Sequence, residues 1–167
     1  IDRPDYSATY TILASEKGGC IDDTIVYRVS GERVFTVANA CNRTRDYEHL
    51  RKLSKKFDVT VRPRYEEEGI LSVQGPNAAD VLSRILDTGL PQKPMTVMLS
   101  SFKGQQLILS RTGYTGSVGF ELFAVKGLLV PLWEALLEAG EEHGLEPIGI
   151  GARNTLRLEA GFALYGH

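Results

Sequence analysis

Two adjacent carboxylates, Asp22 and Asp23, stand between the glycine pair Gly18–Gly19 and an apolar stretch of the sequence. Successive side chains of a strand point to opposite faces, so only one of the two carboxylates can face a ligand. A carboxylate held in such a place can act as a base or stabilise a developing cation. The alternative is that Asp22 caps the turn, a position for which Asp is well suited.

A second candidate is Asn39, which directly follows the apolar run Val34–Ala38. Its side-chain amide offers two donor hydrogens and one acceptor oxygen, which suits recognition of the edge of a planar heterocycle. Asn is also a frequent turn former where a strand ends. Both interpretations of Asn39 remain open at this point.

A glycine-rich segment, Arg111–Glu121 (RTGYTGSVGFE), contains three glycines, Tyr114 and Glu121. Glycines allow the backbone to approach a ligand closely. Glu121 lies among apolar strand residues, where a carboxylate is costly without partners. A ligand with adjacent N–H donors, such as an aminopyrimidine, would supply them. The Lys-Ser/Thr ending of a phosphate-binding loop is missing. A sharp loop between two strands is the alternative.

The fourth candidate is the segment Gly149–Gly161, in which Arg153 and Arg157 share one helix face because they are four residues apart. A helix that begins with Arg suits a ligand carrying a carboxylate. The letters GIGARN depart from the dinucleotide-binding pattern, which requires a third glycine. An exposed helix with internal salt bridges is the alternative.

The elements that must position these residues are mostly strands joined by tight turns. The pattern predicts strands over residues 9–13, 24–29, 34–38, 59–61, 70–74, 96–102, 105–110 and 120–125. It predicts an amphipathic helix with Tyr47, Leu50, Leu53 and Phe57 on one face. We expect Pro76 and Pro131 each to open a further helix, the second one running through Trp133 and ending at Gly140, and a last helix over 152–160. The predicted class is α+β, antiparallel sheets with flanking helices.

Composition is typical of a globular protein, with 43% hydrophobic and 24% charged residues. The formal net charge of -2 gives no overall attraction to nucleic acid. The two cysteines, Cys20 and Cys41, have no zinc-site spacing, so we expect free thiols and no metal. No apolar run reaches the ~20 residues that span a bilayer. The chain starts with Ile1 rather than Met, so we expect it to be a piece of a longer protein.

The candidate segments occur in one order along the chain, as YTIL, GGCIDD, VANACN, LSVQGPNAADVL, SRTGYTGSVGFE and IGARNTLRLEAGFALYGH. In this order they resemble the glycine-cleavage T-protein family, the tetrahydrofolate-dependent aminomethyltransferases. The resemblance covers most of the chain, from about Tyr10 to His167, and its last two blocks are the most specific. It implies a folate-binding T-protein-like fold. It also implies that residues 1–167 form the central folate-binding portion, as one domain or two interleaved α+β lobes, without the family's N-terminal segment and C-terminal β-barrel.

The resemblance assigns a role to seven residues of this sequence. Asp23 falls on the catalytic carboxylate of the family. The residues that fall on the folate- or substrate-binding positions are Tyr10, Asp22, Asn39, Tyr114, Glu121 and Arg153. Two positions depart from the usual pattern. Asn154 stands where the family has an Asp that braces the Arg, and Ser117 stands where the family usually has Glu.

The reaction implied by the resemblance transfers an aminomethyl-derived one-carbon unit from the lipoyl arm of the H-protein to tetrahydrofolate. The products are 5,10-methylenetetrahydrofolate and ammonia, as in glycine catabolism, and no metal, membrane or nucleic acid takes part. The location would be cytoplasmic in a bacterium or the mitochondrial matrix in a eukaryote. Three alternatives share the fold: a folate domain of a demethylase or dehydrogenase, a folate-binding helper of iron–sulphur cluster assembly, and a non-catalytic homologue. The helper's Lys-Gly-Cys-Tyr motif is missing at Arg111–Tyr114.

Overall fold

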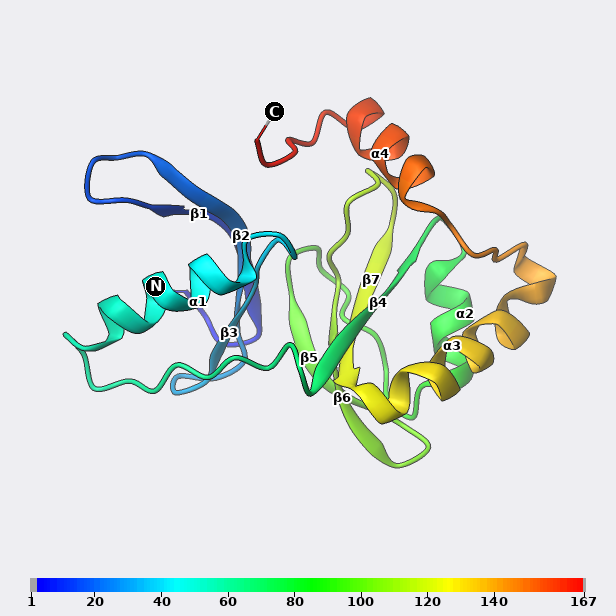
Figure 1. Ribbon diagram of the computed structural model, residues 1–167. Coiled ribbons are helices and arrows are strands. Elements are labelled where there is room, and N and C mark those ends of the chain that lie inside the picture. Colours follow the sequence, from blue (N-terminus) through cyan, green and yellow to red (C-terminus); the bar gives the residue numbers. More distant parts are fainter. Residues whose placement is uncertain (1–2, 167) are drawn as a thin grey trace. The chain divides into compact units, whose positions relative to one another are not determined.

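The computed structural model describes residues 3–166 of the chain, which forms two compact units. The first unit comprises Ile1–Glu66 together with Tyr165–His167, and the second comprises Glu67–Leu164. Each unit has its own antiparallel sheet and its own helices (Figure 1). The prediction of an α+β fold with antiparallel sheets and flanking helices is therefore confirmed. The two units are described separately below.

The first unit is built on a three-stranded sheet in the order β1-β2-β3. Its strands are β1 (Ser7–Ala14), β2 (Cys20–Arg28) and β3 (Val34–Val37). Strand β2 begins four residues earlier than the sequence pattern predicts. The interpretation of Asp22 as a turn cap is therefore wrong, because Asp22 lies within β2 and pairs with Leu13 of β1.

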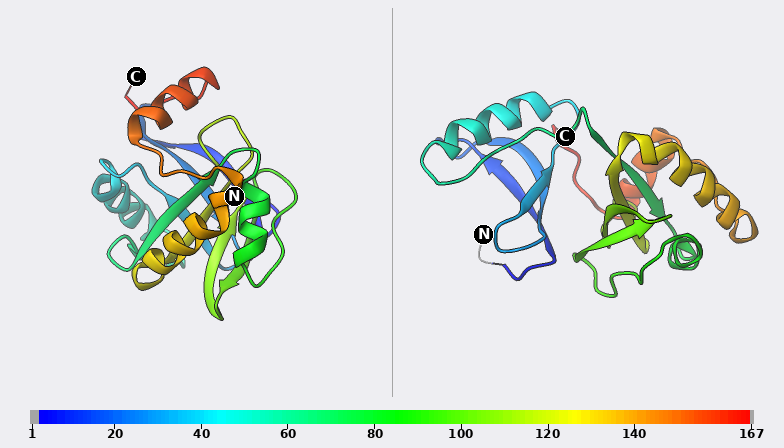
Figure 2. Two further views of the ribbon diagram at one scale, coloured as in Figure 1. Left: turned by 90° about the vertical axis from the view of Figure 1, so that its right-hand side faces the viewer. Right: turned by 90° about the horizontal axis from the view of Figure 1, so that it is seen from below.

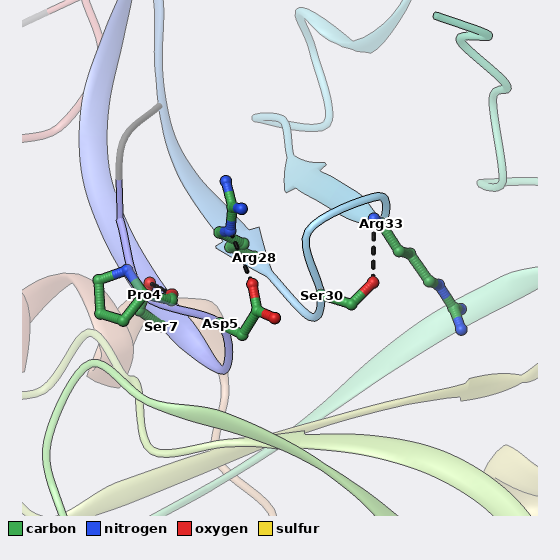
Figure 3. Close-up of polar contacts among 6 residues, drawn as sticks. All are labelled: Pro4, Asp5, Ser7, Arg28, Ser30 and Arg33. Carbon is green, nitrogen blue, oxygen red and sulfur yellow. Dashed lines mark hydrogen bonds and ion pairs between the residues drawn. The ribbon is translucent and has the colours of Figure 1, made fainter.

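Polar contacts fix both ends of the β2–β3 connection (Figure 3). Arg28, the last residue of β2, forms an ion pair of 2.8 Å with Asp5. The turn that follows is closed by the Arg33 N–H, which donates to the Ser30 hydroxyl at 3.2 Å. In the interior, the ring of Tyr27 stacks on Phe35 with 4.6 Å between centroids. The stacking of Tyr27 on Phe35 and the hydrogen bond at the Ser30–Arg33 turn therefore help to set the register of β2 against β3.

Helix α1 (Arg43–Ser54) follows β3 and completes the first unit. It starts earlier than the apolar spacing suggests, and its predicted apolar face is only partly buried. Phe57 lies beyond the helix and is exposed. The buried residue of the helix is instead a carboxylic acid, Asp46. The strand expected over 59–61 does not form, and that segment is irregular.

The second unit contains a four-stranded antiparallel sheet in the order β4-β7-β6-β5. Its strands are β4 (Glu68–Gln74), β5 (Val97–Phe102), β6 (Gln105–Ser110) and β7 (Gly119–Val125). Strands β5 and β6 form the predicted hairpin around Lys103 and Gly104. Both turn residues have positive φ, 50° and 75°, as a tight hairpin turn requires.

Helices α2 (Ala78–Ile85) and α3 (Lys126–Gly140) pack on each other and on this sheet (Figure 2). Together with the sheet they enclose an apolar core that includes Leu82, Leu109, Leu122 and Leu132. Neither helix starts with its proline. Pro76 precedes the N-cap residue of α2, and Pro131 lies inside α3, which begins five residues before it. Trp133 lies within α3, as predicted, and is 42% exposed.

After α3 the chain makes a short 3-10 turn, η1 (Glu141–His143), and then forms helix α4 (Ile150–Glu159). The prediction of a last helix ending before Gly161 is correct to within two residues. No residue of α4 is fully buried. Within residues 3–166, none of the helices combines the length and the apolar character that a membrane-spanning helix requires. No three His, Cys, Asp or Glu side chains in that range are grouped as metal ligands.

Candidate active-site residues

The first cluster of candidate residues is centred on Asp23, in the middle strand of the three-stranded sheet. In the β1–β2 register Asp23 lies opposite Ile12, so Tyr10 is its diagonal neighbour on the same face. The Tyr10 hydroxyl donates to Asp23 Oδ2 at 2.6 Å. Tyr10 is 55% exposed and Asp23 is half-buried, so this pair stands at the surface of the first unit.

Asn39 reaches Asp23 from the other side of β2. Strands β2 and β3 pair Ile25 with Val37, and continuing that register by two residues brings Asn39 opposite Asp23. Asn39 Nδ2 lies 2.8 Å from Asp23 Oδ1 and 2.9 Å from Asp22 Oδ1. These two contacts use the donor side of the amide. Its carbonyl oxygen Oδ1 is the atom with which Asn39 can accept from a ligand.

Asp22 points to the opposite face of β2 and is completely buried. It accepts three hydrogen bonds: from the Asn39 N–H at 3.1 Å, from Asn39 Nδ2, and from Asn42 Nδ2 at 2.6 Å. Burial alone would raise the pKa of Asp22, but hydrogen bonds from Asp46, Asn39 and Asn42 lower it below its usual value. Asp22 therefore lies on the buried face of β2, opposite to the face of Asp23, and its assignment as a folate- or substrate-binding residue stays a prediction.

Asp46 was not among the residues singled out in the sequence. It lies in the first turn of α1, is only 2% exposed, and contacts Asp22. Burial, followed by the hydrogen bond and charge of Asp22, raises the pKa of Asp46 to about 7. The available sequence signal was the i, i+4 spacing of Asn42 and Asp46, because Asn42 is the N-cap residue of α1.

The second cluster lies in the second unit and is centred on Glu121 of β7. Strand β7 is internal to its sheet, and Glu121 pairs with Ser72 of β4 and Ser110 of β6. The Thr112 hydroxyl donates to Glu121 Oε2, and Thr112 Oγ1 lies 2.5 Å from the buried Ser110 hydroxyl. Glu121 is half-buried, on the face of β7 opposite to the side chains of its buried neighbours Phe120 and Leu122, and the Thr112 hydroxyl supplies a partner of the kind that a carboxylate needs there.

Tyr114 joins the glycine-rich loop to helix α4 and the segment after it. The Arg153 guanidinium lies over the Tyr114 ring, 4.4 Å from the ring centroid. The same ring stacks on Phe162 at 5.8 Å, and its hydroxyl donates to the Ala163 carbonyl. A guanidinium stacked by its face keeps its N–H groups at the edge, where they can bind a carboxylate. Arg157 instead donates to the Phe162 carbonyl at 3.1 Å, a local contact.

Gln74 is a second residue that sequence reasoning missed. Its side chain runs beneath the glycine-rich loop, accepting from Thr115 Oγ1 at 3.1 Å and donating to the Thr112 carbonyl at 3.3 Å. A β-carbon on Gly113 or on Gly119 would stand only 2.0 Å or 1.9 Å from Gln74 Oε1. These two glycines therefore make room for Gln74, whereas the sequence interpretation gave them to a ligand.

The candidate residues thus form two groups, one in each unit. Tyr10, Asp22, Asp23 and Asn39 are joined by hydrogen bonds in the first, and Tyr114 stacks with Arg153 in the second, where Glu121 is held by Thr112. The roles of these residues in binding or catalysis stay predictions.

Comparison with known proteins places this arrangement in a defined class. The aminomethyltransferase of Chloroherpeton thalassium is 40% identical over 164 residues, 98% of this chain and 45% of the relative. That of Chlorobium phaeovibrioides is 41% identical over 168 residues, 98% of this chain and 46% of the relative. The crystal structure of glycine cleavage system aminomethyltransferase T from Bartonella henselae matches with a TM-score of 0.81 at 35% identity, over 96% of this chain and 42% of that one.

The fold is therefore that of aminomethyltransferase T. The family model of the GCVT N-terminal domain matches residues 1–167, and the chain belongs to that family. The resemblance inferred from the motifs is confirmed. The chain spans somewhat less than half of the length of the curated relatives it matches. A heterotetrameric sarcosine oxidase from Corynebacterium sp. U-96 also matches, with a TM-score of 0.58 over 75% of this chain and 64% of that one, but at 18% identity this likeness concerns the fold alone.

Proposed function

We propose that the protein carrying this chain transfers an aminomethyl-derived one-carbon unit from the lipoylated H-protein to tetrahydrofolate. The products are 5,10-methylenetetrahydrofolate, ammonia and the dihydrolipoyl arm. The observation that carries the proposal is Asp23, a half-buried carboxylate at the surface of its unit, held by Tyr10 on one side and Asn39 on the other. The membership in the GCVT N-terminal domain family supports it. Because the relatives named above are bacterial, we place the reaction in the cytoplasm.

The balance of the reaction defines what the protein must supply. Two new C–N bonds join the methylene carbon to N5 and N10 of the folate. The C–S and C–N bonds of the adduct break, and the two protons lost from N5 and N10 leave on the thiol and on ammonia. Positive charge develops on the methylene carbon while these bonds exchange. An ionised Asp23 beside that carbon stabilises the charge without forming a bond to it.

The chain's own contacts suit such a role for Asp23. Both carboxylate oxygens are held, Oδ2 by Tyr10 and Oδ1 by Asn39, so the charge has a fixed position before substrate arrives. Preorganised charge is more effective than charge that must reorient during the reaction. We therefore assign to Tyr10 and Asn39 the role of orienting Asp23. To the carbonyl oxygen Oδ1 of Asn39 we also assign the role of accepting a hydrogen bond from the edge of the pterin.

We assign binding of the folate to residues of the second unit. Glu121 is a fixed, half-buried carboxylate and accepts from the amino and ring N–H groups of a pterin, which are adjacent donors. Tyr114 offers an aromatic ring, and the edge of the stacked Arg153 guanidinium suits the carboxylate of the folate tail. Within the second unit, Glu121, Tyr114 and Arg153 offer an anionic acceptor, an aromatic ring and a cation, which are groups that suit a folate. When bound, the folate supplies the nucleophilic nitrogens, and the protein orients and polarises.

The test is formation of methylenetetrahydrofolate from aminomethylated H-protein by the complete polypeptide that carries this sequence. Asp23→Ala and Asp23→Asn should reduce kcat by roughly 100-fold or more, as loss of a preorganised charge does. Glu32→Gln removes an exposed carboxylate from the β2–β3 turn and serves as the matched control. A loss of less than about tenfold, ~1.4 kcal/mol, would remove Asp23 from its assigned role. Folate binding without turnover by the unmodified protein would instead favour a non-catalytic folate-binding homologue.

A further inference from the structure

Among the acidic residues within 3–166, the buried one that the proposed reaction leaves unused is Asp46. Its carboxylate oxygens are both sealed from solvent, and neither has a hydrogen-bond donor among the described protein groups. Its neighbour Asp22 is equally buried but accepts three hydrogen bonds from Asn39 and Asn42. An ionised carboxylate without donors in such a place is very costly.

Two buried carboxyl groups in contact cannot both be ionised at moderate cost, so the pair is expected to hold one proton. The distribution of donors decides where the proton resides. Amide N–H groups surround Asp22, which is therefore the acceptor, and Asp46 is left as the group that must carry a hydrogen of its own. Protonated Asp46 then donates to Asp22, and the buried pair carries a single negative charge.

The pair is connected to the surface through Asn39. The same Nδ2 group that donates to Asp22 Oδ1 at 2.9 Å also lies 2.8 Å from Asp23 Oδ1. A change in the position of the Asp22 carboxylate therefore moves the amide that orients Asp23. Asn42 adds a second link, because it begins α1, its carbonyl accepts from the Asp46 N–H at 3.0 Å, and its side chain donates to Asp22.

We propose that Asp46 is a positioning residue: it carries the proton shared with Asp22 and so fixes, through Asn39, the orientation of Asp23. The proposal rests on the role assigned to Asp23 above. In the part of the chain that the structure describes, the charged and titratable groups near the Asp22–Asp46 pair are Asp23 of β2, Arg45 of α1 and Tyr165, whose hydroxyl accepts from Arg45 at 2.8 Å. The Arg45 charge favours ionised Asp46, whereas burial and Asp22 oppose it and outweigh Arg45.

The dependence on pH follows from the pKa of about 7 that burial and Asp22 give to Asp46. Below that pH Asp46 holds its proton and donates to Asp22. Above it the proton is lost, two charges face each other, and the hydrogen bond that fixes Asp22 disappears. Activity that depends on an oriented Asp23 should therefore fall as pH rises through about 7.

Asp46→Asn tests this directly, because an amide keeps the shape and the donor of a protonated carboxyl group but cannot titrate. We expect kcat/KM within about twofold of the unmodified enzyme at pH 6. The ratio of variant to unmodified enzyme should then rise roughly fivefold or more by pH 8. Asp46→Ala, which removes the donor, should lose activity at both pH values, and Asp58→Asn, at an exposed site, is the matched control. Identical pH profiles for unmodified enzyme and Asp46→Asn would overturn the proposal, as would equal losses in the Asn and Ala variants.

A second measurement does not depend on turnover. In infrared difference spectra of the purified protein, the C=O stretch of a protonated carboxyl group should be present at pH 6, decline near pH 7 and be lost in Asp46→Asn. Absence of that band in the unmodified protein overturns the proposal even if the enzyme is active. Its presence in a protein that forms no methylenetetrahydrofolate supports the shared proton while the proposed function fails.

Discussion

Tyr10 and Asp23 lie on adjacent strands and share a hydrogen bond of 2.6 Å between the phenol hydroxyl and Oδ2 of the carboxylate. Their pairing follows from the antiparallel register, which makes them diagonal neighbours on one face of the sheet. The contact is half exposed, so its strength in the absence of substrate is limited by competition with water. Under the proposed function, its value lies in holding one oxygen of the Asp23 carboxylate in place.

Tyr10→Phe removes this hydroxyl and keeps the ring. A hydrogen bond to a charged group is worth about 1.5–3 kcal/mol, so we expect kcat to fall by roughly 10- to 100-fold. Folate affinity should change much less, because Tyr10 acts on Asp23. Steady-state kinetics and a folate titration separate the two quantities. Equal losses in both would show that Tyr10 contacts the folate itself.

Glu121→Gln replaces the carboxylate of β7 by a neutral group of the same shape. The pterin donors then lose a charged acceptor, so folate affinity should fall by roughly tenfold or more. Glu134→Gln on the exposed side of α3 is the control. Isothermal titration with tetrahydrofolate measures both variants. An unchanged dissociation constant for Glu121→Gln would remove Glu121 from the site.

Gly119→Ala should destabilise the second unit, because the new methyl group would stand 1.9 Å from Gln74 Oε1. Gln74 must then leave its place and lose its contacts with Thr112 and Thr115. We expect a loss of about 1–3 kcal/mol in the free energy of unfolding, measured with urea. Gly127→Ala, where nothing lies within 4 Å of the new carbon, should cost little. The double variant Gly119→Ala/Gln74→Ala should recover part of the loss, and strict additivity would contradict this explanation.

Asp46→Asn should change how stability depends on pH. The pKa of Asp46 is raised from 3.8 to about 7, so the folded state binds more protons than the unfolded state between these values. The contribution of Asp46 to stability therefore falls as pH rises from about 4 to about 7. At pH 8 the Asn variant should be more stable than the unmodified protein by on the order of 1–3 kcal/mol. The assignment would be contradicted if the urea midpoints of the Asn variant and the unmodified protein differed by the same amount at pH 4 and at pH 8.

Tyr114→Leu tests the link between the glycine-rich loop and α4. Loss of the ring removes the cation–π contact with Arg153 and the stack on Phe162, each worth about 0.5–1.5 kcal/mol. We expect faster amide hydrogen exchange in α4, with exchange in α3 unchanged. Tyr114→Phe keeps the ring and should show a smaller effect. Uniform acceleration in both helices would mean that the unit as a whole is destabilised.

Local chemistry explains which parts of the fold could be predicted from the sequence. The β5–β6 hairpin follows from the turn at Lys103 and Gly104, which needs few residues to specify it. The beginning of α3 was missed because the sequence marks it with Pro131, which helices usually accept only in their first turn. Here Pro131 is exposed in the second turn, and tertiary packing of Leu128 and Leu132 decides where the helix begins.

The candidate site likewise contains residues that the local sequence identifies and residues that only tertiary packing identifies. Asp23 and Asn39 were found because their neighbours form recognisable motifs. Asp46 was not, because an Asp in the first turn of a helix normally serves the helix dipole in water. Apart from Asn42, four residues earlier, nothing in the local sequence marks Asp46 as buried, because its burial depends on packing against Asp22 of β2. Gln74 was missed for a similar reason, since its partners are in the loop between β6 and β7.

The first unit is interrupted in the sequence by the whole of the second, because it includes Ile1–Glu66 and regains the chain only at Tyr165. Tyr165 bonds to Arg45, whose guanidinium also donates to the carbonyl of Ile21, next to Asp22. During synthesis on the ribosome, the contact between Arg45 and Tyr165 cannot form until the whole of the second unit, Glu67–Leu164, has been made. The neighbourhood of the buried acid pair is therefore completed only after the second unit has been synthesised, and a polypeptide truncated within Glu67–Leu164 lacks the Tyr165 contact with Arg45.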